Sequence, residues 1–322
     1  MDLSIVISAY NEAESLPELF QRISETLSSK GFEYELIVID DGSTDGTWSV
    51  IEKYSAEYPI RAVSFRRNYG KSAALFCGFE MAEGDFVITM DADLQDSPEE
   101  LPEMITMIRE GGYDLVSGWK KRRHDSKLAK NIPSKIYNAT ARRVTGIKLH
   151  DMNCGLKIYK RDVVKNIEVY GEMHRYIPYL AKNAGFENIA EKVVVHAPRK
   201  YGKSKFGVSR FTNGFLDLLT LWFLSKFSKK PMHFFGLAGI ITFFIGFCTS
   251  LYIIIDKLYA QAHGLNFRAV TDQPLFYISL VALIVGIQLF LSGFIAEIVS
   301  RNSSERNTYK IKREISRKSS VI

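Results

Sequence analysis

Two long apolar segments constrain what this chain of 322 residues can fold into. Residues 234–255 and residues 275–296 each run for 22 positions without a charged side chain. A helix needs about 20 mainly apolar residues to cross a hydrocarbon core about 30 Å thick, so both segments are long enough to span a membrane. A buried helix of a soluble core is the alternative for either segment, but such helices are usually shorter. We therefore predict a two-helix membrane anchor over residues 231–298.

The charges that flank the two segments indicate how the chain is oriented. Basic residues precede the first segment and follow the second: Lys226, Lys229, Lys230, Arg301, Arg306, Lys310, Lys312 and Arg313. The connection between the segments has only Lys257 and Arg268, offset by Asp256 and Asp272. Because Lys and Arg accumulate on the cytoplasmic side, both termini are predicted to be cytoplasmic. We expect a multi-pass protein of a cell inner membrane, or of the endoplasmic reticulum membrane if the source is eukaryotic.

The first 207 residues alternate between strand and helix patterns. Apolar runs predict strands over residues 3–9, 35–39, 62–65, 86–90, 114–119, 156–159 and 193–195, and amphipathic stretches predict helices over residues 15–29, 47–58, 72–81 and 174–184. Such an alternation predicts a mostly parallel sheet with helices on both faces. The three cysteines are far apart in the sequence, which fits a reducing compartment and argues against a disulfide framework.

Polar residues follow the predicted strands where each strand ends: Asn11, Asp40, Asp41, Arg67, Lys71 and Asp91. The carboxyl ends of parallel strands meet at one edge of a sheet, where open α/β sheets bind ligands. Asp40 or Asp41 can accept hydrogen bonds from a base or a ribose, and the basic residues with the helix start after Gly70 suit a diphosphate. The alternative is that both aspartates are turn and capping residues. Neither a GxGxxG fingerprint nor a GxxxxGK[ST] motif is present, which argues against the usual dinucleotide and P-loop folds.

The strand over residues 86–90 runs directly into two carboxylates, Asp91 and Asp93, followed by the amide of Gln95. These side chains offer only oxygen ligands, which suit Mg²⁺ or Mn²⁺ and argue against zinc. Such an ion typically bridges one or two carboxylates to a substrate diphosphate. A polar turn after a strand is the alternative, and the DxD pattern alone does not decide between them.

Four motifs in this order resemble those of the family 2 glycosyltransferases: SAYNE at residues 8–12, DDGSTD at 40–45, NYGK at 68–71 and DADLQD at 91–96. DADLQD followed by Pro98 is similar to the branch that acts on polyprenyl phosphates. This branch includes dolichol-phosphate mannose synthases, bactoprenol glucosyltransferases and undecaprenyl-phosphate aminoarabinose transferases. The resemblance extends through HRYIP at residues 174–178 and RKYGKSKF at 199–206 into the apolar segments, so it covers nearly the whole chain. It implies a GT-A fold and inverting transfer of a sugar from a nucleotide donor to a lipid phosphate.

The resemblance also implies roles for individual residues. The nucleotide-sugar would contact Ala9, Tyr10, Asn11, Glu12, Asp40, Asp41, Asn68, Gly70, Lys71, Asp91, Ala92 and Asp93. The acceptor phosphate would contact Arg122, Ser134, Arg175, Arg199, Ser204 and Lys205. We expect Arg122, Arg199 and Lys205 to align the acceptor, and Asp151 matches an aspartate near the reaction centre of the family. Because a phosphate monoester is largely a dianion at neutral pH, a general base is not required, and Asp151 either orients groups or accepts a proton.

Three further segments are predicted to meet the membrane surface. Residues 127–144 combine apolar residues near helical spacing with basic residues, which suits either an interfacial helix or a helix packed on the domain. Residues 208–230 are predicted to be an interfacial juxtamembrane helix, and residues 299–322 a basic, disordered cytoplasmic tail. Small residues in the apolar segments allow close helix packing within one chain or in a homo-oligomer.

Among possible donors UDP-glucose is favoured, followed by UDP-GlcNAc, an aminoarabinose donor and GDP-mannose. A processive polysaccharide synthase needs a QxxRW-type motif, which is not present. A non-catalytic membrane scaffold that binds nucleotide-sugar or lipid carrier is the alternative of another class. We expect a membrane and a polyprenyl phosphate as partners, and no nucleic acid.

Overall fold

The computed structural model describes residues 1–121, 142–143, 145–198, 200–201, 223, 231–265, 268–302 and 311–315. The chain divides into two compact units, Met1–Leu218 with Arg306–Ile322, and Leu219–Glu305.

The first unit is built on one eight-stranded sheet. Its strands are β1 (Leu3–Ala9), β2 (Tyr34–Asp40), β3 (Ile60–Phe65), β4 (Phe86–Asp91), β5 (Leu115–Trp119), β6 (Lys157–Lys160), β7 (Ile189–Val193) and β8 (Ile311–Ile315), in the order β7-β5-β6-β4-β1-β2-β3-β8. The pairs β1–β2, β1–β4, β2–β3 and β5–β7 are parallel, whereas β4–β6, β5–β6 and β3–β8 are antiparallel. The predicted mostly parallel α/β sheet is therefore confirmed.

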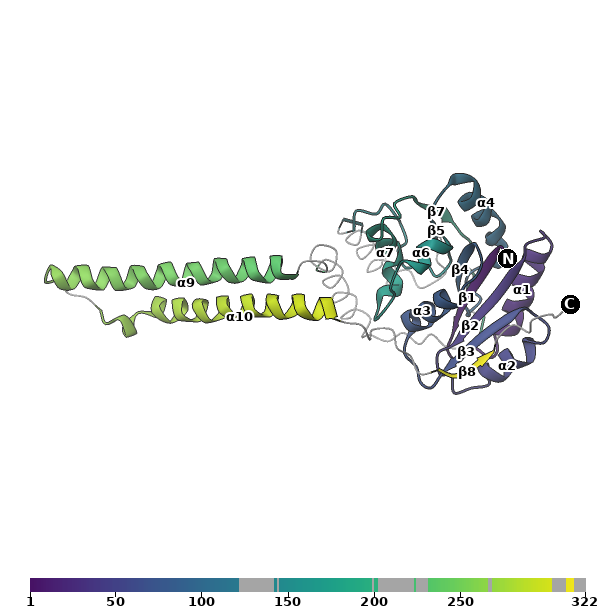
Figure 1. The fold of residues 1–322 in the computed structure, drawn as a ribbon, viewed down its shortest axis with the longest axis horizontal. Helices are drawn as coiled ribbons and strands as arrows, with labels where there is room; N and C mark the ends of the chain where they lie inside the picture. Colours follow the sequence, from purple (N-terminus) through teal and green to yellow (C-terminus); the bar gives the residue numbers. More distant parts are fainter. Residues whose placement is uncertain are drawn as a thin grey trace. The chain divides into compact units, whose positions relative to one another are not determined.

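Helices cover both faces of this sheet (Figure 1). One layer holds α1 (Leu16–Ser28), α2 (Thr47–Tyr54), the 3₁₀ turn η1 (Pro98–Glu100) and α4 (Leu101–Gly111), and the other holds α3 (Lys71–Met81), α6 (Arg161–Lys165), η2 (Met173–Tyr176) and α7 (Ile177–Asn183). Helix α1 shows why these segments are helical, because its buried apolar residues recur at helical spacing: Leu16, Leu19, Phe20, Ile23 and Leu27. They pack into the main hydrophobic core against β1 and β2.

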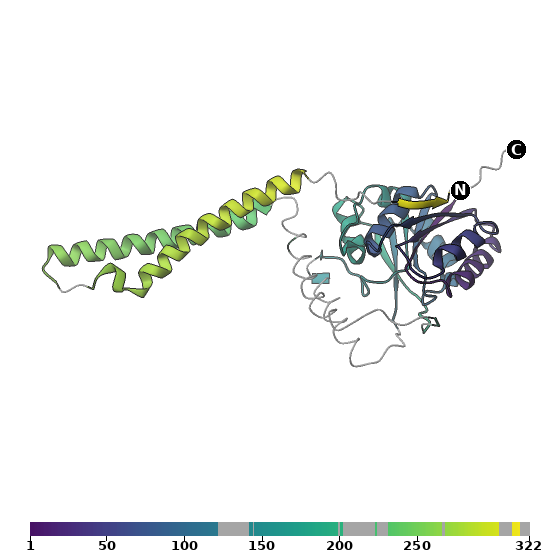
Figure 2. The same ribbon diagram turned by 90° about the horizontal axis from the view of Figure 1, so that it is seen from below.

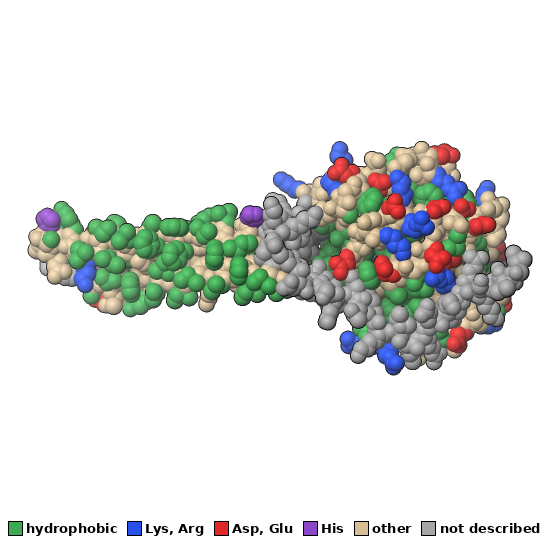
Figure 3. Space-filling model, viewed as in Figure 1, with side chains coloured by type: hydrophobic (Ala, Val, Ile, Leu, Met, Phe, Trp, Pro, Cys, Tyr) green, Lys and Arg blue, Asp and Glu red, His purple; other side chains and the backbone are tan. Residues whose placement is uncertain are grey.

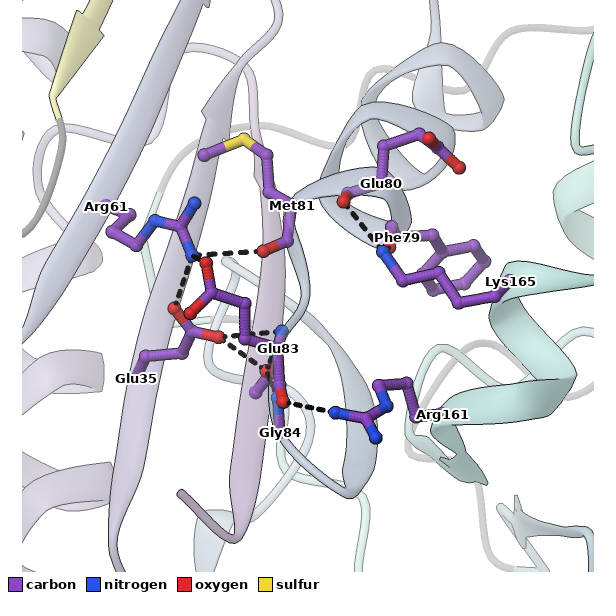
Figure 4. Close-up of polar contacts among 10 residues, drawn as sticks. Glu35, Arg61, Phe79, Glu80, Met81, Glu83, Gly84, Arg161 and Lys165 are labelled. Atoms are coloured by element: carbon purple, nitrogen blue, oxygen red, sulfur yellow. Dashed lines mark hydrogen bonds and ion pairs between the residues drawn. The ribbon is translucent and has the colours of Figure 1, made fainter.

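A polar network fixes the end of α3 that lies away from the carboxyl ends of the strands (Figure 4). The Arg61 guanidinium donates to Glu35 Oε2 at 3.0 Å and to the Met81 carbonyl at 3.1 Å. Lys165 Nζ donates to the carbonyl oxygens of Phe79 at 2.8 Å and Glu80 at 2.7 Å. A lysine ammonium thereby satisfies two carbonyls of the last helical turn.

Four features of this unit differ from the sequence prediction. The strand expected over residues 193–195 is wrong, because β7 covers Ile189–Val193 in register with β5. Helix α4 and the antiparallel insertion of β6 were not predicted. The expectation of a disordered tail is wrong for Ile311–Ile315, which forms β8 on β3. Most of the predicted segments 127–144 and 208–230 lie outside the described residues.

The second unit contains α9 (Pro231–Ala262), the 3₁₀ turn η3 (Val270–Asp272) and α10 (Pro274–Asn302). The two long helices run side by side in both views (Figures 1 and 2). Many of their large hydrophobic side chains are exposed, and hydrophobic side chains predominate on the face drawn in Figure 3. Both are long and apolar enough to cross a membrane. A Cβ on Gly239 would lie 2.6 Å from the Gly286 carbonyl oxygen, so glycines permit the close approach of the helices.

Candidate functional site

The ends of the central strands carry the predicted site residues at one edge of the sheet. In the register of the sheet, Ala9 pairs with Asp40 and Ser8 pairs with Asp91. Asp40 in turn pairs with Ser64 on β3. The prediction that the polar residues after these strands share an edge is confirmed for the described residues.

The segment after β1 is fixed by its neighbour after β2. Asn11 has a φ of +53°, a left-handed conformation that asparagine tolerates better than most residues. Its backbone N–H donates to Ser43 Oγ at 2.9 Å, and its Oδ1 accepts the Thr44 N–H at 2.8 Å. The Glu12 N–H donates to Thr47 Oγ1 at 2.9 Å. Asn11 and Glu12 therefore join two loops of the site edge.

Asp40 and Asp41 support these loops through hydrogen bonds to the protein itself. Asp40 is buried, and it accepts the Ser64 hydroxyl at 2.8 Å and the Ser43 N–H at 2.9 Å. Asp41 is also buried, and its two oxygens accept the N–H groups of Tyr69 at 2.7 Å and Gly70 at 2.9 Å. Burial raises the pKa of Asp41 to about 6, although these two N–H groups oppose the rise. The geometry favours the capping alternative for both residues, with Asp41 shaping the loop that leads into α3.

Lys71, the first residue of α3, forms an ion pair with Asp91 Oδ1 at the end of β4. Both side chains are about 30% exposed, at 31% and 29%. Burial would raise the pKa of Asp91, but the positive charges of Lys71, Lys120 and Lys157 outweigh it and hold that pKa well below its usual range. Asp91 is therefore an anion at every physiological pH.

The turn after β4 presents the second carboxylate. Leu94 has a φ of +59°, yet its side chain is buried in the core. Asp93 Oδ1 accepts the Gln95 N–H at 3.1 Å, and both residues are partly exposed. The buried side chain of Leu94 thus stabilises the strained turn that carries Asp93. Asp91, Asp93 and Gln95, the predicted metal ligands, lie at the end of β4 and in the turn that follows it, and their side chains offer only oxygen donors toward a metal. Within the described ranges, no group of three or more His, Cys, Asp and Glu residues comes together as a metal site.

The backbone of Gly155 closes one side of Asp91. A Cβ on Gly155 would lie 2.4 Å from Asp91 Oδ2, so no other residue fits there without a shift. Thr89 Oγ1 donates to the Gly155 carbonyl at 2.8 Å, and the buried Lys157 ammonium donates to the Cys154 carbonyl. Burial lowers the pKa of Lys157. The segment before β6 is therefore held to β4 by Thr89 and to the start of β6 by Lys157.

A buried ion pair lies beside this turn. Lys120 Nζ is 2.8 Å from Oδ1 of Asp96, whose side chain is fully buried. Burial lowers the pKa of Lys120, but Asp96, Cys154 and Asp91 together raise it above its usual value. Asp96 also forms a β-bridge with His196. The end of the DADLQD motif is thereby tied to the end of β5 and to the segment after β7.

Asp151 and His174 are each held by hydrogen bonds to other parts of the domain. Asp151 is buried, its N–H donates to Glu191 Oε1 at 3.0 Å, and its Oδ1 accepts the Asn153 N–H at 3.2 Å. The His174 N–H and Nδ1 both lie 3.0 Å from Ser72 Oγ. Because this hydroxyl accepts the N–H, it can donate its own proton to Nδ1 of a neutral ring. Burial, assisted by Lys71 and Arg175, lowers the pKa of His174 well below its usual value.

Sequence reasoning assigned no role to Lys120, Lys157, Asp96 or Gly155. The available signal was a charged residue inside an apolar strand, as in LKIY at residues 156–159. Arg175 is placed beside Glu172, with 3.3 Å between Arg175 Nη2 and Glu172 Oε2. The predicted acceptor and catalytic residues Arg122, Ser134, Arg199, Ser204 and Lys205 lie outside the described residues. Of the remaining predicted contacts, Ala9 and Ala92 are buried, Tyr10 is half-buried and Asn68 is exposed.

Comparisons with known proteins agree with this architecture. Residues 4–168 match the model of glycosyl transferase family 2. The chain is 35% identical to dodecaprenyl-phosphate galacturonate synthase of Rhizobium johnstonii and 36% identical to undecaprenyl-phosphate 4-deoxy-4-formamido-L-arabinose transferase of Shewanella sediminis. Each alignment covers 94% of this chain and 88% of the relative.

Solved structures share the fold at lower identity. Glucosyl-3-phosphoglycerate synthase from Mycobacterium tuberculosis, in complex with Mn²⁺, uridine diphosphate and glucosyl-3-phosphoglycerate, superposes with a TM-score of 0.53 at 20% identity, over 70% of this chain and 79% of that one. Mannosyl-3-phosphoglycerate synthase from Rubrobacter xylanophilus gives a TM-score of 0.56 at 16% identity, over 70% of this chain and 75% of that one. The predicted GT-A fold is confirmed, and the chain belongs to glycosyl transferase family 2.

Proposed function

We propose that this protein transfers a sugar from a nucleotide donor to a polyprenyl phosphate at the cytoplasmic face of a membrane, with inversion at the sugar carbon. The carrying observation is the paired carboxylates at the end of β4, on a chain similar over 94% of its length to two enzymes named for polyprenyl-phosphate sugars. The shared length includes both candidate spans, which would hold the enzyme where a lipid phosphate presents its charged end. A soluble acceptor would not require them.

The donor would bind along the edge formed by β1, β2 and β4. The loops fixed by Asp40, Asp41 and Asn11 would shape the nucleotide subsite. Asp91 and Asp93, with Gln95 nearby, would hold Mg²⁺ or Mn²⁺, which when bound relieves charge on the departing diphosphate. Lys71, at the start of α3, would be the protein's own positive charge toward the same diphosphate.

Asp151 would act mainly by positioning. Its carboxylate already accepts the Asn153 N–H, and its backbone is held by Glu191, so the loop before β6 is rigid. Because much of a phosphate monoester is already a dianion at neutral pH, alignment behind the sugar carbon matters more than proton removal. We assign that alignment to Arg122, Arg199 and Lys205, with Ser134, Arg175 and Ser204 as further contacts. Near-normal turnover of Asp151→Asn together with loss of turnover in Arg199→Ala would support this division.

The identity of the donor sugar is the most detailed part of the proposal. UDP-glucose remains the donor expected from the sequence, but the two relatives are named for galacturonate and for formamido-arabinose. A panel of labelled UDP- and GDP-sugars should therefore include UDP-galacturonate and the formamido-arabinose donor beside UDP-glucose, UDP-GlcNAc and GDP-mannose.

The test is transfer of label to undecaprenyl phosphate by the full chain in membranes, with Mg²⁺, with Mn²⁺ or with EDTA. Chloroform-soluble label from one donor, absent with EDTA and in Asp93→Ala, is the expected result. If no donor labels the lipid although the protein binds nucleotide, the transferase proposal fails and a scaffold or another acceptor takes its place.

A further inference from the structure

Lys71 occupies the position where a cation would meet Asp91. Its ammonium pairs with Oδ1, and the Gly155 backbone lies against Oδ2 so closely that not even a methyl group fits on that side. A divalent cation approaching Asp91 therefore meets a positive charge already in contact with the carboxylate. Lys120 and Lys157 add to this field, since both interact electrostatically with Asp91.

The anchoring of Lys71 allows its ammonium to move. Its backbone is fixed, because Asp41 holds the preceding N–H groups of Tyr69 and Gly70, and α3 begins at Lys71 itself. Its side chain is 31% exposed, and Asp91 is 29% exposed, so neither end of the ion pair is enclosed. A lysine ammonium is a point charge on a flexible stem, and a partly exposed ion pair costs less to separate than a buried one. The ammonium can therefore leave Asp91 while the rest of the site stays in place.

We propose that Lys71 is a placeholder for the divalent cation: its ammonium neutralises Asp91 in the free enzyme and transfers to the donor diphosphate when the cation binds Asp91 and Asp93. This inference rests on the proposed function, since it takes the donor to be a nucleotide diphosphate. The exchange makes cation and donor bind cooperatively. The cation alone must displace Lys71 without a new partner for its charge, whereas the diphosphate supplies that partner. Coupling between two ligands is reciprocal and commonly amounts to about 5- to 150-fold in affinity.

The test measures binding, not turnover. Mn²⁺ affinity of the full chain in detergent is measured by electron paramagnetic resonance, with and without UDP as the diphosphate probe. For the wild type we expect weak Mn²⁺ binding that UDP tightens by about tenfold or more. Lys71→Met removes the charge but keeps the length of the stem. We expect this variant to bind Mn²⁺ alone about tenfold more tightly than the wild type. Its coupling to UDP should be smaller than in the wild type but not lost, because the diphosphate also coordinates the ion directly.

Lys165→Met is the matched control, because Lys165 contacts the opposite end of the same helix through the carbonyls of Phe79 and Glu80. It should keep the wild-type coupling, and Lys71→Arg, which keeps a charge, should retain most of it. Unchanged or weaker Mn²⁺ binding by Lys71→Met overturns the proposal. So does a wild type that binds Mn²⁺ equally with and without UDP, a result that needs no variant to fold. A negative result in this binding test would overturn the role of Lys71 alone, because transfer of labelled sugar to the lipid is measured in a separate assay.

Discussion

Replacing Gly155 by alanine should disable the site while the domain stays folded. The added Cβ would lie 2.4 Å from Oδ2 and 2.7 Å from Cγ of Asp91, closer than real Cβ contacts allow. The backbone cannot yield easily, because Thr89 holds the Gly155 carbonyl and Lys157 holds the Cys154 carbonyl. Asp91 is the group that can move, since its side chain is 29% exposed at the end of β4.

This clash should lower the free energy of unfolding only slightly but should weaken Mn²⁺–UDP binding clearly. Overpacking a rigid core costs about 1–3 kcal/mol of unfolding free energy, and rotation of a half-exposed carboxylate keeps the cost near the lower end, about 1 kcal/mol. Loss of the Lys71–Asp91 pair adds little, because half-exposed ion pairs contribute about 0–1 kcal/mol. Binding of Mn²⁺ with UDP, however, depends on the position of Asp91 and should weaken by about tenfold or more, which corresponds to at least about 1.4 kcal/mol.

Thermal unfolding and Mn²⁺–UDP binding of the full chain in detergent test this separation. Gly46→Ala is the control, because a Cβ there would meet nothing closer than the Ala13 Cβ at 3.9 Å and its φ of −78° suits alanine. If Gly155→Ala binds Mn²⁺ and UDP like the wild type, the backbone of Gly155 does not position Asp91. A second refuting result would be additive losses in Asp91→Asn/Gly155→Ala, because both changes should act through the same carboxylate.

Three other predictions follow from charges in the domain. The pKa of Asp41 is raised from 3.8 to about 6, so the folded state holds the carboxyl proton of Asp41 more tightly than the unfolded state does. Relative to Asp41→Asn, the wild type should therefore lose up to about 3 kcal/mol of stability as the pH rises from about 4 through 6. Melting temperatures of both proteins across that range test this, and a difference between them that does not change with pH would contradict it. Asp96→Asn should lower the free energy of unfolding by about 3 kcal/mol, because it leaves Lys120 buried without its carboxylate. Arg22→Gln breaks the partly exposed pair with Glu99 and should change the free energy of unfolding by less than about 1 kcal/mol. Equal effects of the two substitutions in chemical denaturation would show that burial of the Lys120–Asp96 pair does not matter. Arg61→Met should destabilise the protein, because Glu35 is buried and loses its cation. The same change should leave Mn²⁺–UDP binding of the folded protein unchanged, because Arg61 contacts the end of α3 that is opposite to Lys71. Weakened binding would indicate that the two ends of the helix are coupled.

The central strands and their shared edge follow from local pattern. The apolar runs of β1, β2 and β4 are buried on both faces. β2 and β4 end in an aspartate and β1 is followed closely by Asn11, so the sequence indicates both the strand and its end. The candidate spans follow equally from composition, because 22 uncharged residues have few alternatives. These features need no knowledge of distant contacts.

The features that were missed depend on partners far away in the sequence. The apolar run Val193–Val195 suggests a strand, but its first and last valines are 51% and 62% exposed, and the strand is instead placed by pairing of Ile189 with Leu115. Strand β8 exists because β3 offers a free edge about 250 residues earlier, which no local pattern reveals. Helix α4 is a different case, because its buried residues Leu101, Met104, Ile105 and Ile108 do follow helical spacing and were overlooked.

Four of the six aspartates in the two motifs, Asp40, Asp41, Asp91 and Asp93, divide according to what their oxygens already bind. Asp40 and Asp41 are buried and accept backbone N–H groups, so their charge is used to build loops. Asp91 and Asp93 are partly exposed. Asp91 is paired with the Lys71 ammonium, and Asp93 accepts the Gln95 N–H. Both motifs begin with an aspartate that ends a strand, Asp40 on β2 and Asp91 on β4, so residue type at the strand end does not separate the two uses. Burial separates them, because a carboxylate that must exchange partners during a reaction has to stay within reach of solvent, whereas one that shapes a loop does not.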